Sequence, residues 1–185
     1  MRKNVLPMAS LALLRVSPLL CATSYVTFTF SEDTFIRPLI HTAPSTTDTE
    51  LRRHSNRILP SFNRFTRRGL PFIFISYPLS IATAAANLRQ LGPSIILSGN
   101  GELRCRTAAM FYLAGLVFSA LHFSFGPAAM ACLKRVSQDK RIHGDFNADN
   151  TANLVSWLRI NTVRGAVADL PSWLCYIIAF MLAME

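Results

Sequence analysis

Charged residues are scarce in this chain of 185 residues, since only 16% are charged and 51% are hydrophobic. A soluble domain usually carries about 25% charged residues. The mean hydropathy is +0.30, and the apolar residues come in long runs rather than in short alternating segments. The composition therefore argues against an ordinary soluble domain and indicates burial in a lipid bilayer.

Acidic residues are the rarer kind of charge, with 10 Asp and Glu against 19 Lys and Arg, which gives a net charge of +9. A basic excess can indicate nucleic-acid binding. Here, however, the basic residues lie between apolar runs, and no nucleic-acid-binding motif accompanies them. We interpret them as loop charges that contact lipid headgroups. The lipid bilayer is the expected partner, and no nucleic acid is expected.

Motifs for metals and common cofactors are missing. The four cysteines form no CxxC pair, and the four histidines are scattered, which argues against a zinc site or a disulfide framework. There is also no GxGxxG, P-loop, GxSxG or HExxH sequence. We therefore expect no metal and no nucleotide or haem cofactor.

Long apolar runs are what the sequence does contain. They predict an all-α integral membrane four-helix bundle, with residues 1–185 forming a single transmembrane domain. Arg2 and Lys3 before Val5–Leu14 also resemble a signal peptide, but no clear cleavage site follows, so a retained first helix is the main interpretation and a cleaved signal the alternative. The expected spans are residues 9–30, 70–88, 107–133 and 163–184.

A long polar loop is expected at residues 31–69. Within it, Glu50–Phe65 has apolar residues at helical spacing with arginines between them, which predicts either a surface amphipathic helix or a disordered linker. The loops that follow the first and third spans carry most of the basic residues. By the positive-inside rule, both termini should face the lumen or exterior. We expect the endoplasmic reticulum or another endomembrane as the location.

Small and polar residues recur every three or four positions along three of the spans, which places each set on one helix face. Such residues allow helices to approach closely in lipid and to bond across the interface. These stripes predict the faces that meet in the bundle interior: Ser76, Ser80, Thr83 and Asn87; Gly115, Ser119, His122 and Gly126; Gly165, Asp169, Ser172, Tyr176 and Ala179.

Three ionisable residues lie inside or at the edge of the spans: His122, Arg164 and Asp169. Charges within a bilayer are costly and mark functional sites unless they are paired or reach the headgroups. A structural interpretation has Arg164 at the headgroups and His122 bonded to a neighbouring helix. A catalytic interpretation has His122 as a base that removes a proton from an acidic carbon or phenol. Arg164 would then stabilise the oxygen anion that forms.

The segment around Trp157, Asn161 and Arg164 reads W-x3-N-x2-R and leads into the last span. Together with Arg68-Gly69 ahead of the second span, it resembles the anthrone-oxygenase-like family of small four-helix membrane proteins from fungal polyketide gene clusters. Residues 126–129 read Gly-Pro-Ala-Ala, where that family commonly has Ala-Pro-Thr-Asn, and this departure bears on the reaction more than on the fold.

The resemblance implies a cofactor-independent membrane oxygenase that uses dioxygen as co-substrate and acts on a lipophilic aromatic or polyketide intermediate of secondary metabolism. It implies Asn161, Trp157 and Arg68 as substrate-binding residues and Arg164 as a catalytic one. His122 and Asp169 are the other catalytic candidates, chosen for their position inside the spans. Partner biosynthetic enzymes would supply the substrate. Two alternatives stay open from the sequence: a non-enzymatic scaffold or small transporter-like protein, and a membrane cyclase or isomerase.

Overall fold

Helices account for every residue that the computed structural model describes, namely residues 8–41, 48–91, 103–137 and 150–184. Each of these four ranges forms one continuous helical rod, and each contains a segment long and apolar enough to cross a membrane. The predicted all-α membrane fold with four spans is therefore confirmed. The rods are α1 (Met8–His41), α2 (Asp48–Leu91), α4–η1–α5 (Leu103–Leu121, His122–Phe125, Gly126–Ser137) and α6–η3–α7 (Asn150–Arg164, Gly165–Asp169, Leu170–Met184).

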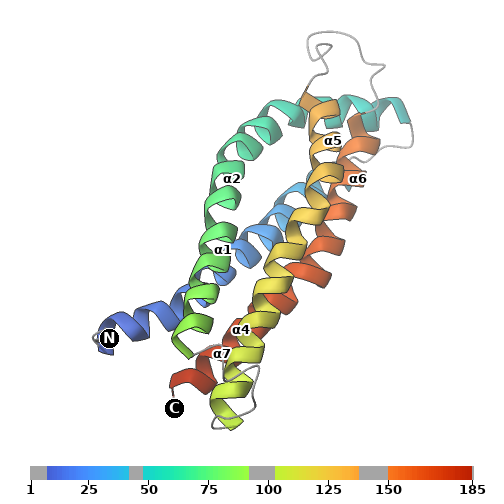
Figure 1. Ribbon diagram of the computed structural model, residues 1–185. Coiled ribbons are helices and arrows are strands. Elements are labelled where there is room, and N and C mark those ends of the chain that lie inside the picture. The colour runs from blue at the N-terminus through green and yellow to red at the C-terminus, as the bar shows by residue number, and fades with distance from the viewer. Residues whose placement is uncertain (1–7, 42–47, 92–102, 138–149, 185) are drawn as a thin grey trace.

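The first two helices extend well into the segment that the sequence predicts as a polar loop. Helix α1 continues to His41, and α2 begins at Asp48, so the expected loop at 31–69 is largely helical. The segment Glu50–Phe65 is helical and belongs to the start of α2, whose first turns lie across one end of the bundle in Figure 1. Its placement on the membrane surface stays a prediction. Hydropathy missed the extension of α1 because its polar residues have partners: Arg37 pairs with Asp33 one turn earlier.

The start of α1 and the end of α7 lie at the same end of the bundle, beside the end of α2 (Figure 1). Helix α4 packs along α7, α1 packs along α2, and α5 packs along α6. At the terminal end, Arg15 of α1 donates to the carbonyl oxygen of Ala183 at 2.5 Å and ties the first and last helices together. The predicted topology of two termini on one side agrees with this arrangement, and the side of the membrane that they face stays a prediction.

The polar stripes were predicted to face the bundle interior, and most of their members are buried there. They meet in a cluster of hydroxyl groups, in which Ser119 lies 2.7 Å from Ser172 and 3.1 Å from the hydroxyl of Tyr176. The hydroxyl of Tyr25 from α1 lies 2.7 Å from the hydroxyl of Ser172. Because lipid offers no hydrogen-bond partners, this cluster lets the four rods associate through polar groups that satisfy one another.

Two prolines mark the places where the third and fourth rods leave α-helical geometry. A proline inside a helix has no N–H and collides with the carbonyl four residues earlier. Pro127 follows the 3₁₀ turn η1, which contains His122, and Pro171 follows the π-helical turn η3, which ends at Asp169. In η3 the N–H of Leu170 donates to the oxygen of Gly165, five residues earlier. These irregular turns set the directions of the ionisable side chains, and π turns of this kind are frequent at functional sites.

Candidate functional site

His122 and Asp169 form a buried pair between the third and fourth rods. Nδ1 of His122 lies 3.0 Å from Oδ1 of Asp169, and the two residues are 6% and 2% exposed. A carboxylate can only accept, so Nδ1 carries a proton, and in the neutral imidazole Nε2 then keeps its lone pair. The ring of Tyr77 lies against the imidazole, with centroids 3.6 Å apart. Asp169 thus fixes the tautomer in which His122 can act as a base.

Arg164 is the cation of the site and is also buried. Its Nε lies 3.5 Å from Oδ2 of Asp169, and it also donates to the side-chain oxygen of Asn161 one turn earlier. Two residues five apart on an α-helix point about 140° away from each other. The wider π turn between Arg164 and Asp169 reduces this angle, so the two side chains meet on one face of the rod.

Glu32 brings a second carboxylate to Arg164 from helix α1. Its Oε2 lies 3.6 Å from the NH2 nitrogen of Arg164, and both side chains are more than nine-tenths buried. Oε2 of Glu32 accepts no hydrogen bond within the described part of the chain. Thr29, one turn earlier on α1, donates to Oδ2 of Asp169 at 3.0 Å. Helix α1 therefore supplies two of the polar groups that surround Arg164 and Asp169.

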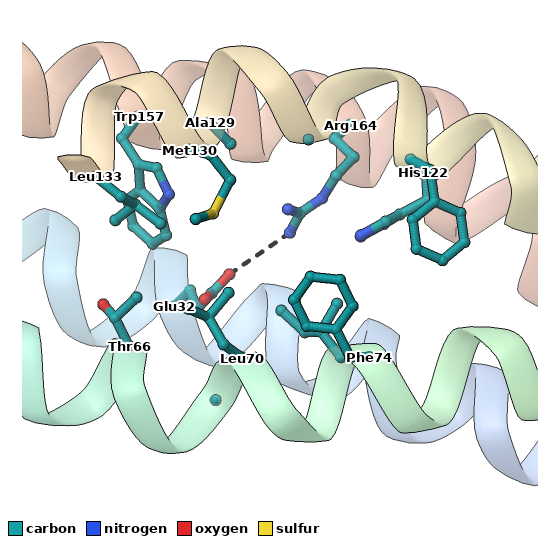
Figure 2. A pocket seen from close by; sticks show the side chains of 14 residues that line it. Glu32, Thr66, Leu70, Phe74, His122, Ala129, Met130, Leu133, Trp157 and Arg164 are labelled. Atoms are coloured by element: carbon teal, nitrogen blue, oxygen red, sulfur yellow. Dashed lines mark ion pairs between the residues drawn. The ribbon is translucent and has the colours of Figure 1, made fainter.

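An apolar cavity of about 260 Å³ adjoins this cluster. Figure 2 shows Arg164 between Glu32 on one side and His122 on the other, with hydrophobic side chains covering the rest of the wall. The cavity lies among α1, α2, the third rod and α6. Apolar lining with a few convergent polar groups is typical of a binding site for a lipophilic small molecule. The apolar lining includes Leu70, Ile73, Phe74, Phe123, Met130, Leu133 and Trp157.

The structure brings together five of the six residues that the sequence singled out. His122, Arg164 and Trp157 line the cavity, while Asp169 and Asn161 hold His122 and Arg164 in position from behind. Arg68 is not brought to the cavity. It is exposed and borders a shallow groove on the outer surface between α1 and α2. Its neighbour Gly69 lines the cavity instead.

Sequence reasoning missed Glu32 because it ended the first helix at residue 30. It missed Thr29, which lies inside that predicted span, because it singled out no polar stripe on the first helix. A signal for them exists in the sequence. Buried residues of α1 recur at spacings of three and four, and an acidic residue that continues such a stripe indicates a helix that carries its charge inward. The buried stripe consists of Ala22, Tyr25, Thr29, Glu32 and Ile36.

The cluster combines a histidine base, an arginine that can bind an oxygen anion, and two carboxylates, all next to an apolar space. In the part of the chain that the structure describes, no three His, Cys, Asp or Glu side chains gather as a metal site would require. The fold and this site define a class of protein: a multi-pass, four-helix membrane protein with a buried acid–base cluster that opens on a lipophilic cavity.

Comparison with known proteins identifies the family. The chain is 30% identical over 181 residues to epoxidase pydX of an Acremonium species, a match that covers 94% of this chain and 96% of that protein. It is 27% identical over 177 residues to epoxidase gkaX of Penicillium citrinum, a match that covers 95% of this chain and 97% of that protein. The probable epoxidase scpX of Mollisia scopiformis is 26% identical over 179 residues, a match that covers 93% of this chain and 96% of that protein. No protein-family model and no solved structure matches the chain.

The chain therefore belongs to the family of these fungal epoxidases. The four spans and the relatives together support membrane, oxidoreductase and secondary-metabolite assignments. The predicted oxygenase-type role is supported in this coarse form. The relatives are named for epoxidation. They support a fungal oxygenase-type family, and the anthrone reaction that the sequence resemblance implied stays a prediction.

Proposed function

We propose that the protein is a membrane epoxidase that uses dioxygen to oxidise a lipophilic polyketide-type intermediate without an organic or metal cofactor. The observation that carries this proposal is the His122–Asp169 pair on the wall of an apolar cavity, with Arg164 beside it. The names of three relatives supply the reaction class.

In this proposal, Nε2 of His122 removes a proton from an acidic C–H or O–H group of the substrate. Arg164 stabilises the negative oxygen that develops, as a buried cation does for an enolate or phenolate. The substrate anion then gives an electron pair to dioxygen and forms a C–O–O bond. The apolar cavity favours this step, because it excludes water that would otherwise protonate the anion.

An epoxide follows if the peroxide lies near a carbon–carbon double bond of the same substrate. The distal oxygen bonds to both alkene carbons while the O–O bond breaks, and the remaining alkoxide takes the proton back from His122. Both oxygen atoms stay in the product, and the substrate supplies all the electrons. No external reductant is therefore required.

Anthrone-type oxidation is the second candidate and uses the same first two steps. If the peroxide carbon still carries a hydrogen, the peroxide loses water and leaves a carbonyl group. The observation that favours this candidate is that Trp157, Asn161 and Arg164, the residues of the W-x3-N-x2-R pattern, all belong to the cavity wall or support it.

The test uses membranes that contain the chain and matched membranes that contain His122→Ala. Each is given a lipophilic phenol that bears a conjugated alkene, and separately anthrone, under ¹⁸O₂ or under nitrogen. We expect oxygen-dependent product with two labelled oxygens from the alkene substrate, and loss of about 10²-fold or more in rate in the variant, as for removal of a general base. Product that forms equally in both membranes would refute the mechanism. Activity that requires an added reductant or metal would refute its independence of cofactors.

A further inference from the structure

Glu32 has a buried side-chain oxygen that makes no hydrogen bond within the described part of the chain. Tyr77, Asn161 and Arg164 also have a buried atom of this kind, and Glu32 is the carboxylate among the four. The side chain is 6% exposed, so Oε2 can reach little solvent. A buried acceptor that is left unsatisfied costs free energy, and such groups in native proteins call for an explanation. The carboxylate also lines the apolar cavity. Arg164 is the ion-pair partner of this oxygen at 3.6 Å, and a ligand in the cavity can supply the hydrogen bond that the oxygen lacks.

Charge decides which kind of partner fits. Oε2 lies 3.6 Å from a nitrogen of Arg164, so a positive group is already present and a cationic ligand at the same oxygen would be repelled. An anionic ligand would be repelled by the carboxylate itself. A neutral hydroxyl or N–H group can donate to Oε2 without either penalty, and hydrogen bonds to a charged acceptor are the stronger kind.

Position decides what the donor does. Figure 2 shows Glu32 and His122 on opposite sides of the Arg164 guanidinium, with the apolar wall between and around them. A donor bound at Glu32 therefore holds one end of the ligand while another part of the ligand lies at His122. This orientation matters because catalysis requires a defined placement of the reacting group.

We propose that Glu32 is the anchor for a neutral hydrogen-bond donor on the substrate, so that the protein selects lipophilic molecules that carry a hydroxyl or N–H group at the end away from the oxidised carbon. This inference deepens the proposed function, whose substrate class it narrows. It rests on the cavity geometry and on the unsatisfied oxygen of Glu32.

The test measures binding alone, without oxygen. Trp157 lines the cavity and is one of two tryptophans in the chain. In a Trp173→Phe background its fluorescence reports on ligands in the cavity. The probes are 2-naphthol and its methyl ether, 2-methoxynaphthalene, which differ in the donor. We expect 2-naphthol to bind about tenfold more tightly, as one charge-assisted hydrogen bond provides.

The matched variants lie side by side on α1. Glu32→Leu should remove the preference for the naphthol, and Glu32→Gln, with its neutral acceptor, should reduce it to about threefold. Asp33→Asn changes the charge at the next residue, which pairs with Arg37 and is partly exposed, and should keep the full preference. If Glu32→Leu does not fold, the pair Glu32→Gln and Asp33→Asn still decides the question.

Three results would overturn the anchor: equal binding of the two probes to the parent protein, an unchanged preference in Glu32→Gln and Glu32→Leu, or a preference that disappears in His122→Ala alone. Because no turnover is measured, the outcome is separate from that of the proposed function. A preference that depends on Glu32 in a protein without oxygenase activity would refute the reaction and leave the donor site standing.

Discussion

Replacement of Asp169 by asparagine is the sharpest test of how the buried cluster works. Oδ1 accepts from His122 at 3.0 Å, while Oδ2 accepts from Thr29 at 3.0 Å and lies 3.5 Å from Arg164. Asparagine has the same shape but one oxygen and one NH₂ group. In either orientation of the amide, its NH₂ group replaces one of the two oxygens. It then faces either His122, or Thr29 and Arg164, which need an acceptor there.

The expected effects follow from these contacts. If the NH₂ group faces His122, the imidazole must accept on Nδ1 and carry its proton on Nε2, so the base is lost. If the NH₂ group faces Arg164, the cation loses an anionic partner. We expect turnover to fall about 10²- to 10⁴-fold, the usual contribution of a general base. The free energy of unfolding should fall by about 3 kcal/mol, the lower end for a broken buried ion pair, because Arg164 retains Glu32.

The assay compares oxygen-dependent turnover, normalised to folded protein, with denaturant unfolding in mixed micelles. Thr29→Val is the matched control. It removes the hydrogen bond to Oδ2 of Asp169 and the 3.4 Å bond that Thr29 accepts from Arg164, and it leaves the contact between Asp169 and His122 intact. We expect it to cost about 1 kcal/mol in stability and far less in turnover. Wild-type turnover in folded Asp169→Asn protein would refute this reasoning. Equal rate losses in the two variants would mean that the loss reports packing and not the tautomer of His122.

Further predictions concern the packing, the cavity and the topology. A Cβ at residue 115 would lie 2.6 Å from Cε1 of Tyr176, so Gly115→Ala should lower the free energy of unfolding by about 1–3 kcal/mol in the same micelle assay; wild-type stability would show that the third and fourth rods are less closely packed. A Cβ at Gly126, which lines the cavity, meets no atom within 4 Å, so Gly126→Leu should fold normally but bind 2-naphthol at least about tenfold more weakly by occupying the cavity; unchanged affinity would mean that the ligand binds elsewhere. Because the start of α1 and the end of α7 lie at one end of the bundle (Figure 1), tags on the two ends of the chain should be equally protected from protease in sealed vesicles. Protection of one tag alone would contradict the four-span topology.

The sequence by itself determined the class of the fold. Long apolar runs with few charges predict four spans, because an unpaired charge deep in lipid is costly. The spacing of small and polar residues made the interior faces of the helices predictable. Small and hydroxyl residues at spacings of three and four mark the sides on which rods meet, and Ser80, Ser119 and Ser172 all prove to be buried. His122, Arg164 and Asp169 could be selected because ionisable groups inside spans are rare.

The extent of the helices could not be determined in this way. Hydropathy ends the first span near residue 30 because Glu32, Asp33 and Arg37 follow, and it counts each charge without knowing its partner. In the structure Asp33 pairs with Arg37 and Glu32 pairs with Arg164 from a distant part of the chain. Paired charges no longer oppose the helix, so α1 continues and carries Glu32 into the cavity.

Only the tertiary structure decided how the site is assembled. On a regular α-helix Arg164 and Asp169 would point in different directions, and the π turn η3 brings them together. Arg68 was selected with the same kind of evidence as Trp157, yet it lies on the outer surface while Trp157 lines the cavity. Spacing along one helix fixes which residues share a face. Which face meets which, and what space remains between them, depends on the packing of all four rods and cannot be read from any one of them.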